Sequence, residues 1–350
     1  EIMPSLVGSE MCIRDRYIDR TPSLEKEIAL SSNEIIQKIA QNGIVGLGGA
    51  TFPTHVKLTP PKEFKPTVLI VNATECEPYL TSDHRLMLER GEALVAGCRL
   101  LLRLFPGAVC VLAVENNKPD AIAHLSDLVR ACGDARLSVC PLKTKYPQGA
   151  ERQVIYVTTG RKIYSKMLPA DAGCVVDNVQ TVLAVYDAVC KCTPSMTRVM
   201  TLTGDAMAQP QNYKVRFGMS HAELLEEAGG LVEEGAEKII SGGPMMGFAM
   251  FSLDIPTTKT SSSLLCLSKD EVSKVEPSAC INCGRCVEAC PEQLIPSRLA
   301  KFSNNGLAEA FESWHGLECV ECGSCSFVCP ARRLSLIHIS EPTRLGMISY

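Results

Sequence analysis

Eight of the 18 cysteines crowd between positions 280 and 329 and form two runs with the same spacing. The runs are Cys280-x2-Cys283-x2-Cys286-x3-Cys290-Pro291 and Cys319-x2-Cys322-x2-Cys325-x3-Cys329-Pro330. Three thiolates at this spacing wrap one tight loop around an iron–sulfur cube, and the fourth lies on the following helical turn. The pattern predicts a module with two [4Fe–4S] clusters.

The fourth cysteine of each run is expected to ligate the cluster of the other run, as in two-cluster ferredoxins. The first predicted ligand set is Cys280, Cys283, Cys286 and Cys329. The second is Cys319, Cys322, Cys325 and Cys290. Tetrahedral zinc is the alternative, but it needs only paired CxxC units and leaves the remaining cysteines and the two prolines unexplained. Disulfides fit a short, loop-rich secreted chain, which this is not.

A glycine-rich loop at 43–54 (GIVGLGGATFPT) is a second candidate site. Such a loop allows a phosphate to approach the backbone, and Lys57 would add a positive charge. The loop matches neither the GxGxxG fingerprint nor a Walker A loop. A turn with a helix cap is therefore an equally good interpretation of the glycines alone.

An acidic motif follows a predicted buried strand, because TVLIVN at 67–72 runs directly into NATECEPY at 72–79. Ligands of open α/β sheets bind beyond the carboxyl ends of the strands, which is where this motif falls. The simpler alternative is a solvated acidic turn. Cys76 lies inside the motif, whereas Cys98, Cys110, Cys132, Cys140, Cys174 and Cys190 have apolar neighbours and read as core residues.

Strand-like and helix-like segments alternate over residues 31–190, which predicts an α/β domain with a parallel sheet. Strands are expected at 67–72, 108–114 and 137–141, and helices from 31, at 83–104, at 119–131 and from 149. Strands at 198–203, 213–217 and 238–241, with a helix opened by the capping box Ser220–Glu223, predict a small α+β module. The polar stretch 257–263 reads as a linker to the cysteine module.

The composition is that of an ordinary globular chain of 350 residues, with a net charge of −4 and a pI near 6.0. No polybasic segment suggests nucleic acid. No apolar run reaches the roughly 18 residues of a membrane helix, and no signal peptide is recognisable. The expected location is cytoplasmic.

Four motifs in order, GLGGATFPTHVK, NATECEPY, YPQGAERQ and VVDNVQT, resemble the Rossmann-like FMN-binding domain of the complex I flavoprotein. Joined to a β-grasp (soluble ligand-binding) module and a dicluster module, they resemble the family of C subunits of Rnf/Rsx ion-translocating electron-transport complexes. The resemblance implies FMN contacts from Gly46, Gly48, Gly49, Lys57, Asn72, Asn178 and Thr181. It implies nicotinamide-side contacts from Phe52, Glu77 and Glu151, with Glu75 as a further cofactor-binding candidate. Glu77 and Glu151 are expected to face one pocket that also touches Phe52.

The resemblance implies a peripheral electron-transfer subunit at the cytoplasmic face of the inner (plasma) membrane. It would pass electrons between NAD(H), FMN and two [4Fe–4S] clusters, with ferredoxin and other subunits of the complex as partners. The chain departs from the complex I pattern at Thr74, where an acidic residue is usual, and at Ala150, which replaces the first of two glutamates. Two other functions therefore stay open: a docking module without nucleotide binding, and the diaphorase subunit of a soluble hydrogenase or formate dehydrogenase.

The predicted domains are 31–192 (FMN and NAD(H)), 198–256 (β-grasp) and 270–333 (clusters). Residues 1–30 would hold a non-native end and the remnant of a β-rich domain, and 334–350 a non-native tail. The strings at 1–16 and 334–350 fit neither the family nor the neighbouring periodicity and resemble translated sequencing adapters. We expect both ends to make few buried contacts.

Overall fold

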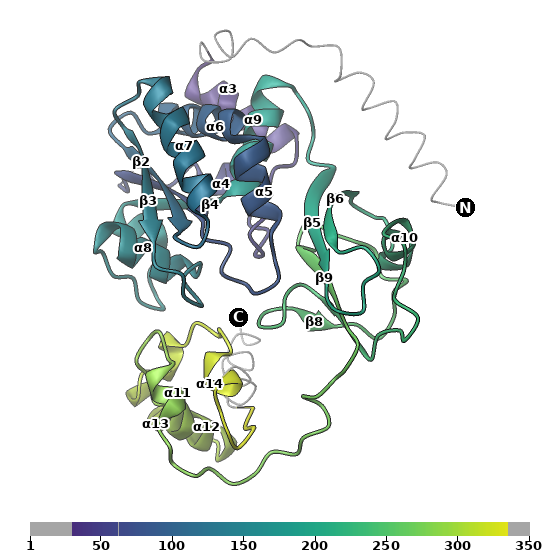
Figure 1. The fold of residues 1–350 in the computed structure, drawn as a ribbon. Helices are drawn as coiled ribbons and strands as arrows, with labels where there is room; N and C mark the ends of the chain where they lie inside the picture. The colour runs from purple at the N-terminus through teal and green to yellow at the C-terminus, as the bar shows by residue number, and fades with distance from the viewer. Residues whose placement is uncertain (1–29, 62, 335–350) are drawn as a thin grey trace.

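The computed structural model describes residues 30–61 and 63–334. Within them the chain forms an α/β domain, a β-grasp module and a helical cysteine module, which lie around a common centre (Figure 1). The expectations about residues 1–16 and about the tail from 335 onwards lie outside the described residues. No helix in the described part of the chain is long and apolar enough to cross a membrane.

The α/β domain contains a four-stranded sheet in which every neighbouring pair is parallel, so the predicted fold class is confirmed. Its strands are β1 (Val68–Ala73), β2 (Val109–Glu115), β3 (Leu137–Leu142) and β4 (Cys174–Asn178). The order is β3-β2-β1-β4, so the strands that follow β1 in the chain lie on both sides of it. The carboxyl ends of β1 and β4 therefore flank a topological switch point, where open α/β sheets bind ligands.

Helices cover both faces of this sheet because alternate residues of β1 point to opposite sides. Leu69 and Val71 pack into the larger core, and Val68 and Ile70 into the core beneath α8. The helices are α3 (Ser32–Gln41), α4 (Thr54–Lys57), α5 (Ser82–Glu89), α6 (Gly91–Leu104), α7 (Pro119–Cys132), α8 (Glu151–Thr159), η1 (Pro169–Ala172) and α9 (Val179–Cys190).

The helix expected at 83–104 is two helices, since α5 ends at Glu89 and α6 begins at Gly91. Arg90, at the break, donates two hydrogen bonds to Asp187 of α9, at 2.8 and 2.9 Å. Gly91 packs so tightly that a Cβ there would come within 2.7 Å of His124 Nε2. These tertiary contacts fix the break, which the apolar periodicity does not reveal.

The β-grasp module has a five-stranded sheet in the order β6-β5-β9-β7-β8. Its elements are β5 (Thr197–Thr203), β6 (Gln211–Arg216), α10 (His221–Glu227), β7 (Lys238–Ser241), β8 (Phe248–Ala249) and β9 (Ser263–Leu267). The linker expected at 257–263 is wrong at its end, because β9 lies between β5 and β7. Ser263 and the three residues after it are buried, so the apolar run that follows the polar stretch belongs to this sheet.

The cysteine module is helical, with α11 (Arg285–Glu288), α12 (Pro296–Asn304), α13 (Ala308–Ser313), η2 (Gly316–Glu318) and α14 (Ser324–Phe327). The two runs repeat their backbone. Positive φ angles recur at equivalent positions, with Asn282 at 55° and Glu321 at 53°, and Gly284 at 78° and Gly323 at 77°. Both cysteine loops thus have the same local conformation.

Candidate cofactor cleft and cluster sites

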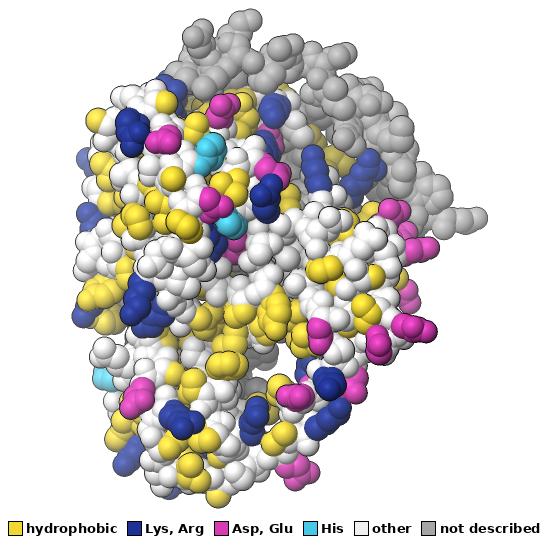
Figure 2. All heavy atoms as spheres, in the orientation of Figure 1, with side chains coloured by type: hydrophobic (Ala, Val, Ile, Leu, Met, Phe, Trp, Pro, Cys, Tyr) yellow, Lys and Arg dark blue, Asp and Glu magenta, His cyan; other side chains and the backbone are white. Residues whose placement is uncertain are grey.

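A cleft of about 970 Å³ lies at the carboxyl edge of the parallel sheet and is lined by all three modules. Asn72 at the end of β1 and Asn178 at the end of β4 are paired in register and form its base. The β-grasp module contributes residues 241–243 and 246–248. The cysteine module contributes Cys319, Val320 and Cys322. In Figure 2, hydrophobic side chains gather around the hollow where the parts of the molecule meet.

Seven of the eleven residues predicted to bind FMN or NAD(H) line this cleft: Gly48, Gly49, Asn72, Glu75, Glu77, Glu151 and Asn178. The other four, Gly46, Phe52, Lys57 and Thr181, are not part of its lining. Three of them shape the glycine loop or its neighbour instead. The Thr181 hydroxyl oxygen accepts a hydrogen bond from the Leu47 N–H at 2.8 Å, and the Gly46 N–H donates to the Phe52 carbonyl at 2.9 Å.

Lys57 points into the protein rather than toward the cleft. Its ammonium donates to the Val176 carbonyl at 2.7 Å and lies 3.5 Å from Asp177 Oδ1. Burial raises the pKa of Asp177 to about 6, and the Lys57 charge opposes that rise. Lys57 therefore balances a buried carboxylate, which a reading of the glycine loop alone does not reveal.

Glu77 lines the cleft, but its carboxylate is already engaged by the β-grasp module. Oε1 accepts hydrogen bonds from the backbone N–H groups of Met245 at 2.7 Å and Met246 at 3.1 Å. Gly243 of the same turn packs against it, since a Cβ there would lie 2.3 Å from Glu77 Cγ. Burial raises the pKa of Glu77 and the two N–H groups lower it. Glu77 thus holds the β-grasp turn against the cleft.

Glu151 lies in the same cleft, at the start of α8, and its carboxylate has no hydrogen bond to any residue that the structure describes. Burial raises its pKa, and the nearby Lys57 charge opposes this. Phe52, expected to touch the pocket of both glutamates, is half exposed and outside the lining. Of the two predicted nicotinamide-side carboxylates, Glu151 is the one with free hydrogen-bonding capacity toward a ligand.

Glu75 also borders the cleft, but its carboxylate serves the start of α5. It accepts hydrogen bonds from the backbone N–H groups of Asp83 at 2.7 Å and His84 at 3.0 Å. Free N–H groups at a helix N-terminus attract a carboxylate in this way. Burial, together with the neighbouring Asp83 charge, raises the pKa of Glu75 to about 8.

This raised pKa gives the fold a pH dependence. Between the ordinary value of 4.5 and about 8, folded Glu75 keeps a proton that the unfolded chain has lost, so stability falls as pH rises through this window. Asp83, whose pKa is also raised by burial, acts in the same direction, while the Lys118 charge opposes it for both groups. Each pKa unit is worth about 1.4 kcal/mol, so we expect a loss of several kcal/mol.

Glu75→Gln cannot ionise, so its free energy of unfolding, measured by urea titration, should vary much less between pH 5 and pH 8. The exposed Glu234→Gln is the control and should keep the wild-type slope. Equal slopes for wild type and Glu75→Gln would contradict the assignment of the buried proton to Glu75.

Two residues of the YPQGAERQ motif have structural roles that the spacing did not reveal. The Tyr146 hydroxyl donates to the Cys322 carbonyl at 2.8 Å and so joins the α/β domain to the cysteine module. The Gly149 carbonyl accepts from Asn72 Nδ2 at 2.8 Å, and a Cβ on Gly149 would lie 2.6 Å from Thr74 Oγ1. The departure at Thr74 is accommodated here, because its hydroxyl donates to Asn72 Oδ1 at 2.8 Å.

The cysteine module forms a small cavity of about 20 Å³ lined by Cys290, Cys319, Cys322 and Cys325. These are the four thiols of the second predicted ligand set, including the one from the first run. Burial, reinforced by the other thiols, raises the pKa of Cys319 to about 11 and of Cys325 to about 12. Four thiols that oppose one another's ionisation need a positive centre between them, and the irons of a cluster would supply it.

The first predicted set follows the same local fold, because its loop repeats the backbone of the second run. The ends of the module are also tied together: the Ser278 N–H donates to the Ala331 carbonyl at 3.0 Å, which brings the start of the first run beside the end of the second. Among the described residues, no three His, Cys, Asp or Glu side chains converge tightly enough to hold a single metal ion.

Polar contacts fix the cysteine module against α8. Arg152 forms an ion pair with Glu318 at 2.9 Å, and the Glu318 carboxylate also accepts from the Ser165 hydroxyl at 2.7 Å. Gln153 donates to Glu292 at 2.9 Å. The cavity of thiols and the cofactor cleft share Cys319, Val320 and Cys322 as a common wall. A cluster on these cysteines would therefore border the cleft directly.

Three family models match the chain in the predicted order. Residues 39–187 match the Nuo51 FMN-binding domain, residues 199–249 the SLBB domain and residues 279–334 the 4Fe-4S dicluster domain. The prediction that the chain contains domains for FMN and for two four-iron clusters is confirmed by these matches.

Three relatives are C subunits of oxidoreductase complexes. The chain is 46% identical to that of the "Proton-translocating ferredoxin:NAD(+) oxidoreductase complex" of Clostridium ljungdahlii, over 87% of this chain and 66% of that protein. It is 46% identical to that of the "Na(+)-translocating ferredoxin:NAD(+) oxidoreductase complex" of Acetobacterium woodii, over 81% and 64%. It is 39% identical to that of the "Ion-translocating oxidoreductase complex" of Haemophilus influenzae, over 83% and 35%. The chain thus spans less than two thirds of the length of these relatives.

Among solved structures, the fold resembles a chain of an NAD+-reducing [NiFe]-hydrogenase in the H2-reduced state, with a TM-score of 0.66. The match covers 94% of this chain and 64% of that one at 20% identity, so it shows a shared fold. The curated relatives are much more similar in sequence, over most of this chain. The chain belongs to the family of C subunits of ion-translocating oxidoreductase complexes.

Proposed function

We propose that this chain is an electron-transfer subunit that passes electrons between NAD(H), a bound FMN and two [4Fe–4S] clusters. The observation that carries the proposal is the wall shared by the cleft and the thiol cavity, formed by Cys319, Val320 and Cys322. It means that a flavin in the cleft and a cluster on these cysteines would be neighbours. When bound, FMN converts between the two-electron chemistry of NAD(H) and the one-electron chemistry of the clusters.

The residues of the chain bind and orient the cofactors in this proposal. The backbone of Gly48 and Gly49 allows a flavin phosphate to approach, and the Asn72 and Asn178 side chains lie at the base of the cleft. Glu151 would orient a nicotinamide or ribose hydroxyl, because it has a carboxylate with free acceptors. Glu77, with Gly243 beside it, would fix the β-grasp wall of the site.

We further propose that the chain works within a membrane-bound ion-translocating complex. Its relatives carry the names of such complexes, two of them with ferredoxin and NAD(+) as reactants. Other subunits and ferredoxin would then be its partners, and its place would be peripheral, on the cytoplasmic face of the membrane. The proposed partners would exchange electrons through the clusters.

The purified protein, reconstituted anaerobically with iron, sulfide and FMN, tests the proposal by its absorption spectrum. We expect the band of an oxidised flavin on top of the broad cluster absorption. Both should bleach when NADH is added, because the cofactors would be neighbours. The same titration with NADH and without added FMN is the control.

Two results would overturn the proposal. A protein that binds clusters but no flavin would favour a docking module without nucleotide binding. Flavin that bleaches with NADH while the clusters stay oxidised, although a chemical reductant reduces them, would show that the shared wall does not conduct electrons.

A further inference from the structure

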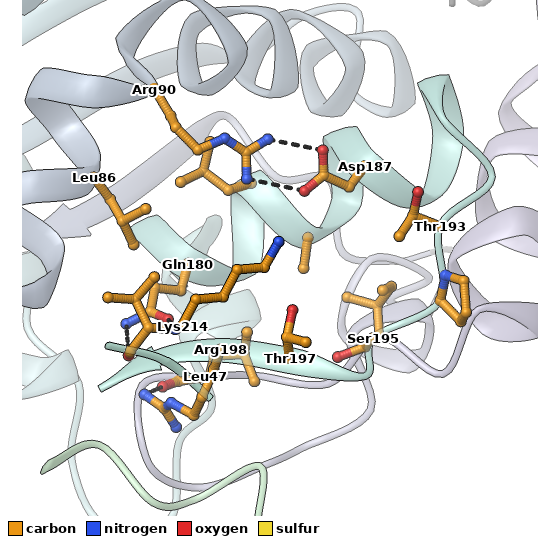
Figure 3. A pocket seen from close by; sticks show the side chains of 15 residues that line it. Leu47, Leu86, Arg90, Gln180, Asp187, Thr193, Ser195, Thr197, Arg198 and Lys214 are labelled. Carbon is orange, nitrogen blue, oxygen red and sulfur yellow. Dashed lines mark hydrogen bonds and ion pairs between the residues drawn. The ribbon is translucent and has the colours of Figure 1, made fainter. Parts of the chain in front are cut away.

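A second, smaller cavity lies at the joint between the α/β domain and the β-grasp module. Its volume is about 110 Å³. Helix α9 and the segment after it form one side, with Asp187 and Ser195, and strands β5 and β6 form the other, with Thr197 and Lys214 (Figure 3). No residue predicted from the sequence to bind a cofactor lines it.

The charges of this cavity favour an anion. Its lining contains three basic side chains, Arg90, Arg198 and Lys214, and one carboxylate, Asp187. That carboxylate is already neutralised, because Arg90 binds both of its oxygens and Lys191 lies 3.3 Å from Oδ1. Arg198 shares its charge with Asp83 on the cleft side, so Lys214 supplies the excess positive charge.

The polar groups of the cavity are not used up by the protein. In Figure 3 the Lys214 ammonium and the Thr197 hydroxyl point into the space beneath the Arg90–Asp187 pair. Neither has a hydrogen-bond partner among the residues that the structure describes. Ser195 Oγ and Arg198 Nε, two further lining groups, are buried and also lack a partner within the described chain. Buried polar groups are normally hydrogen-bonded, so unsatisfied groups around one space indicate an occupant.

The size of the cavity limits what that occupant is. Nucleotide-sized ligands need several hundred Å³. A volume of 110 Å³ corresponds to about four water molecules at roughly 30 Å³ each. An ion with a few oxygen atoms around one centre fits this volume and can accept hydrogen bonds from an ammonium and several hydroxyls at once.

We propose that this cavity binds a small inorganic oxyanion of the phosphate or sulfate type. Lys214 provides the counter-charge, and the hydroxyls of Ser195 and Thr197 donate hydrogen bonds. The site lies one wall away from the cleft, since Leu47, Gln180 and Arg198 line both cavities. An oxyanion here would therefore brace the joint between the two modules from the side opposite to the cofactors.

The test measures phosphate binding to the full chain loaded with flavin and clusters, so that a flavin phosphate occupies the cleft. In isothermal titration calorimetry against inorganic phosphate at constant ionic strength, we expect saturable binding of one ion per chain. Lys214→Gln should weaken it roughly tenfold or more, as expected for loss of a charge-assisted hydrogen bond. Thr197→Val, which keeps the shape of the side chain, should weaken it by a smaller factor.

Lys166→Gln is the matched control, because Lys166 is an exposed lysine outside both cavities, and its affinity should equal that of wild type. Melting temperatures in phosphate and in chloride of equal ionic strength give a second readout, and only phosphate should raise them. Absence of saturable binding to the wild type overturns the proposal, as does equal affinity in Lys214→Gln. Neither result bears on the flavin and cluster function, because the variants leave the cleft intact.

Discussion

Replacing Cys290 by serine is expected to destroy the cluster held mainly by the other cysteine run. Cys290 belongs to the first run in the sequence, yet it lines the cavity of Cys319, Cys322 and Cys325. The iron content should fall from about eight to about four per chain, since each cluster holds four irons. Electron paramagnetic resonance of the reduced protein should lose the signal of one cluster only.

The effect on electron flow should be larger still, because the lost cluster is the one that borders the cleft. NADH should then reduce the flavin but no longer the remaining cluster. Cys329→Ser is the reciprocal variant, which should lose the other cluster and keep NADH-dependent reduction of the cluster beside the cleft. Cys140→Ser, a half-buried thiol of β3, should change neither.

A Cys290→Ser protein that keeps the cluster of Cys319, Cys322 and Cys325 and loses the cluster of its own run would refute the crossed ligation. Comparison with Cys319→Ser identifies which signal belongs to which cluster, because that residue lies in the second run under either assignment.

Replacing Glu151 by glutamine is expected to lower kcat/KM for NADH oxidation by roughly 10- to 100-fold. This is the range expected when a hydrogen bond to a charged group, worth about 1.5–3 kcal/mol, is weakened or lost. The carboxylate lines the cleft and has no hydrogen-bond partner among the described residues, so a ligand would be its partner. Flavin content, measured by absorbance after protein denaturation, should stay unchanged.

Glu77→Gln is the matched control in the same cleft. Both N–H groups that bind Glu77 use the single oxygen Oε1, and a glutamine side chain keeps one such carbonyl oxygen. Its activity should therefore fall less than that of Glu151→Gln. Glu77→Ala removes the acceptor and should free the β-grasp turn, seen as faster proteolysis near Met245.

Full NADH activity in Glu151→Gln, with a large loss in Glu77→Gln, would exchange the two roles. Full activity in both would mean that neither carboxylate faces the nicotinamide, and the docking-module function would then be favoured.

The sequence by itself determined the features that depend on local spacing. Cysteines at matching intervals give each cluster loop its backbone conformation, and the alternation of strands and helices gives the parallel sheet. The capping boxes at Ser31 and Ser220 are formed as expected, because their partners are three residues away. The end of β1 was identified as a ligand edge, since strand direction alone decides which edge that is.

The tertiary structure decided which side chains remain free for a ligand. Glu75, Glu77 and Lys57 all belong to motifs near the site, but a helix terminus, the β-grasp turn and a buried aspartate respectively engage their charged groups. These partners lie up to 169 residues away along the chain, and their identity depends on how separate modules pack. Burial makes each unpaired charge costly, so packing assigns these buried charges partners that no local pattern can reveal.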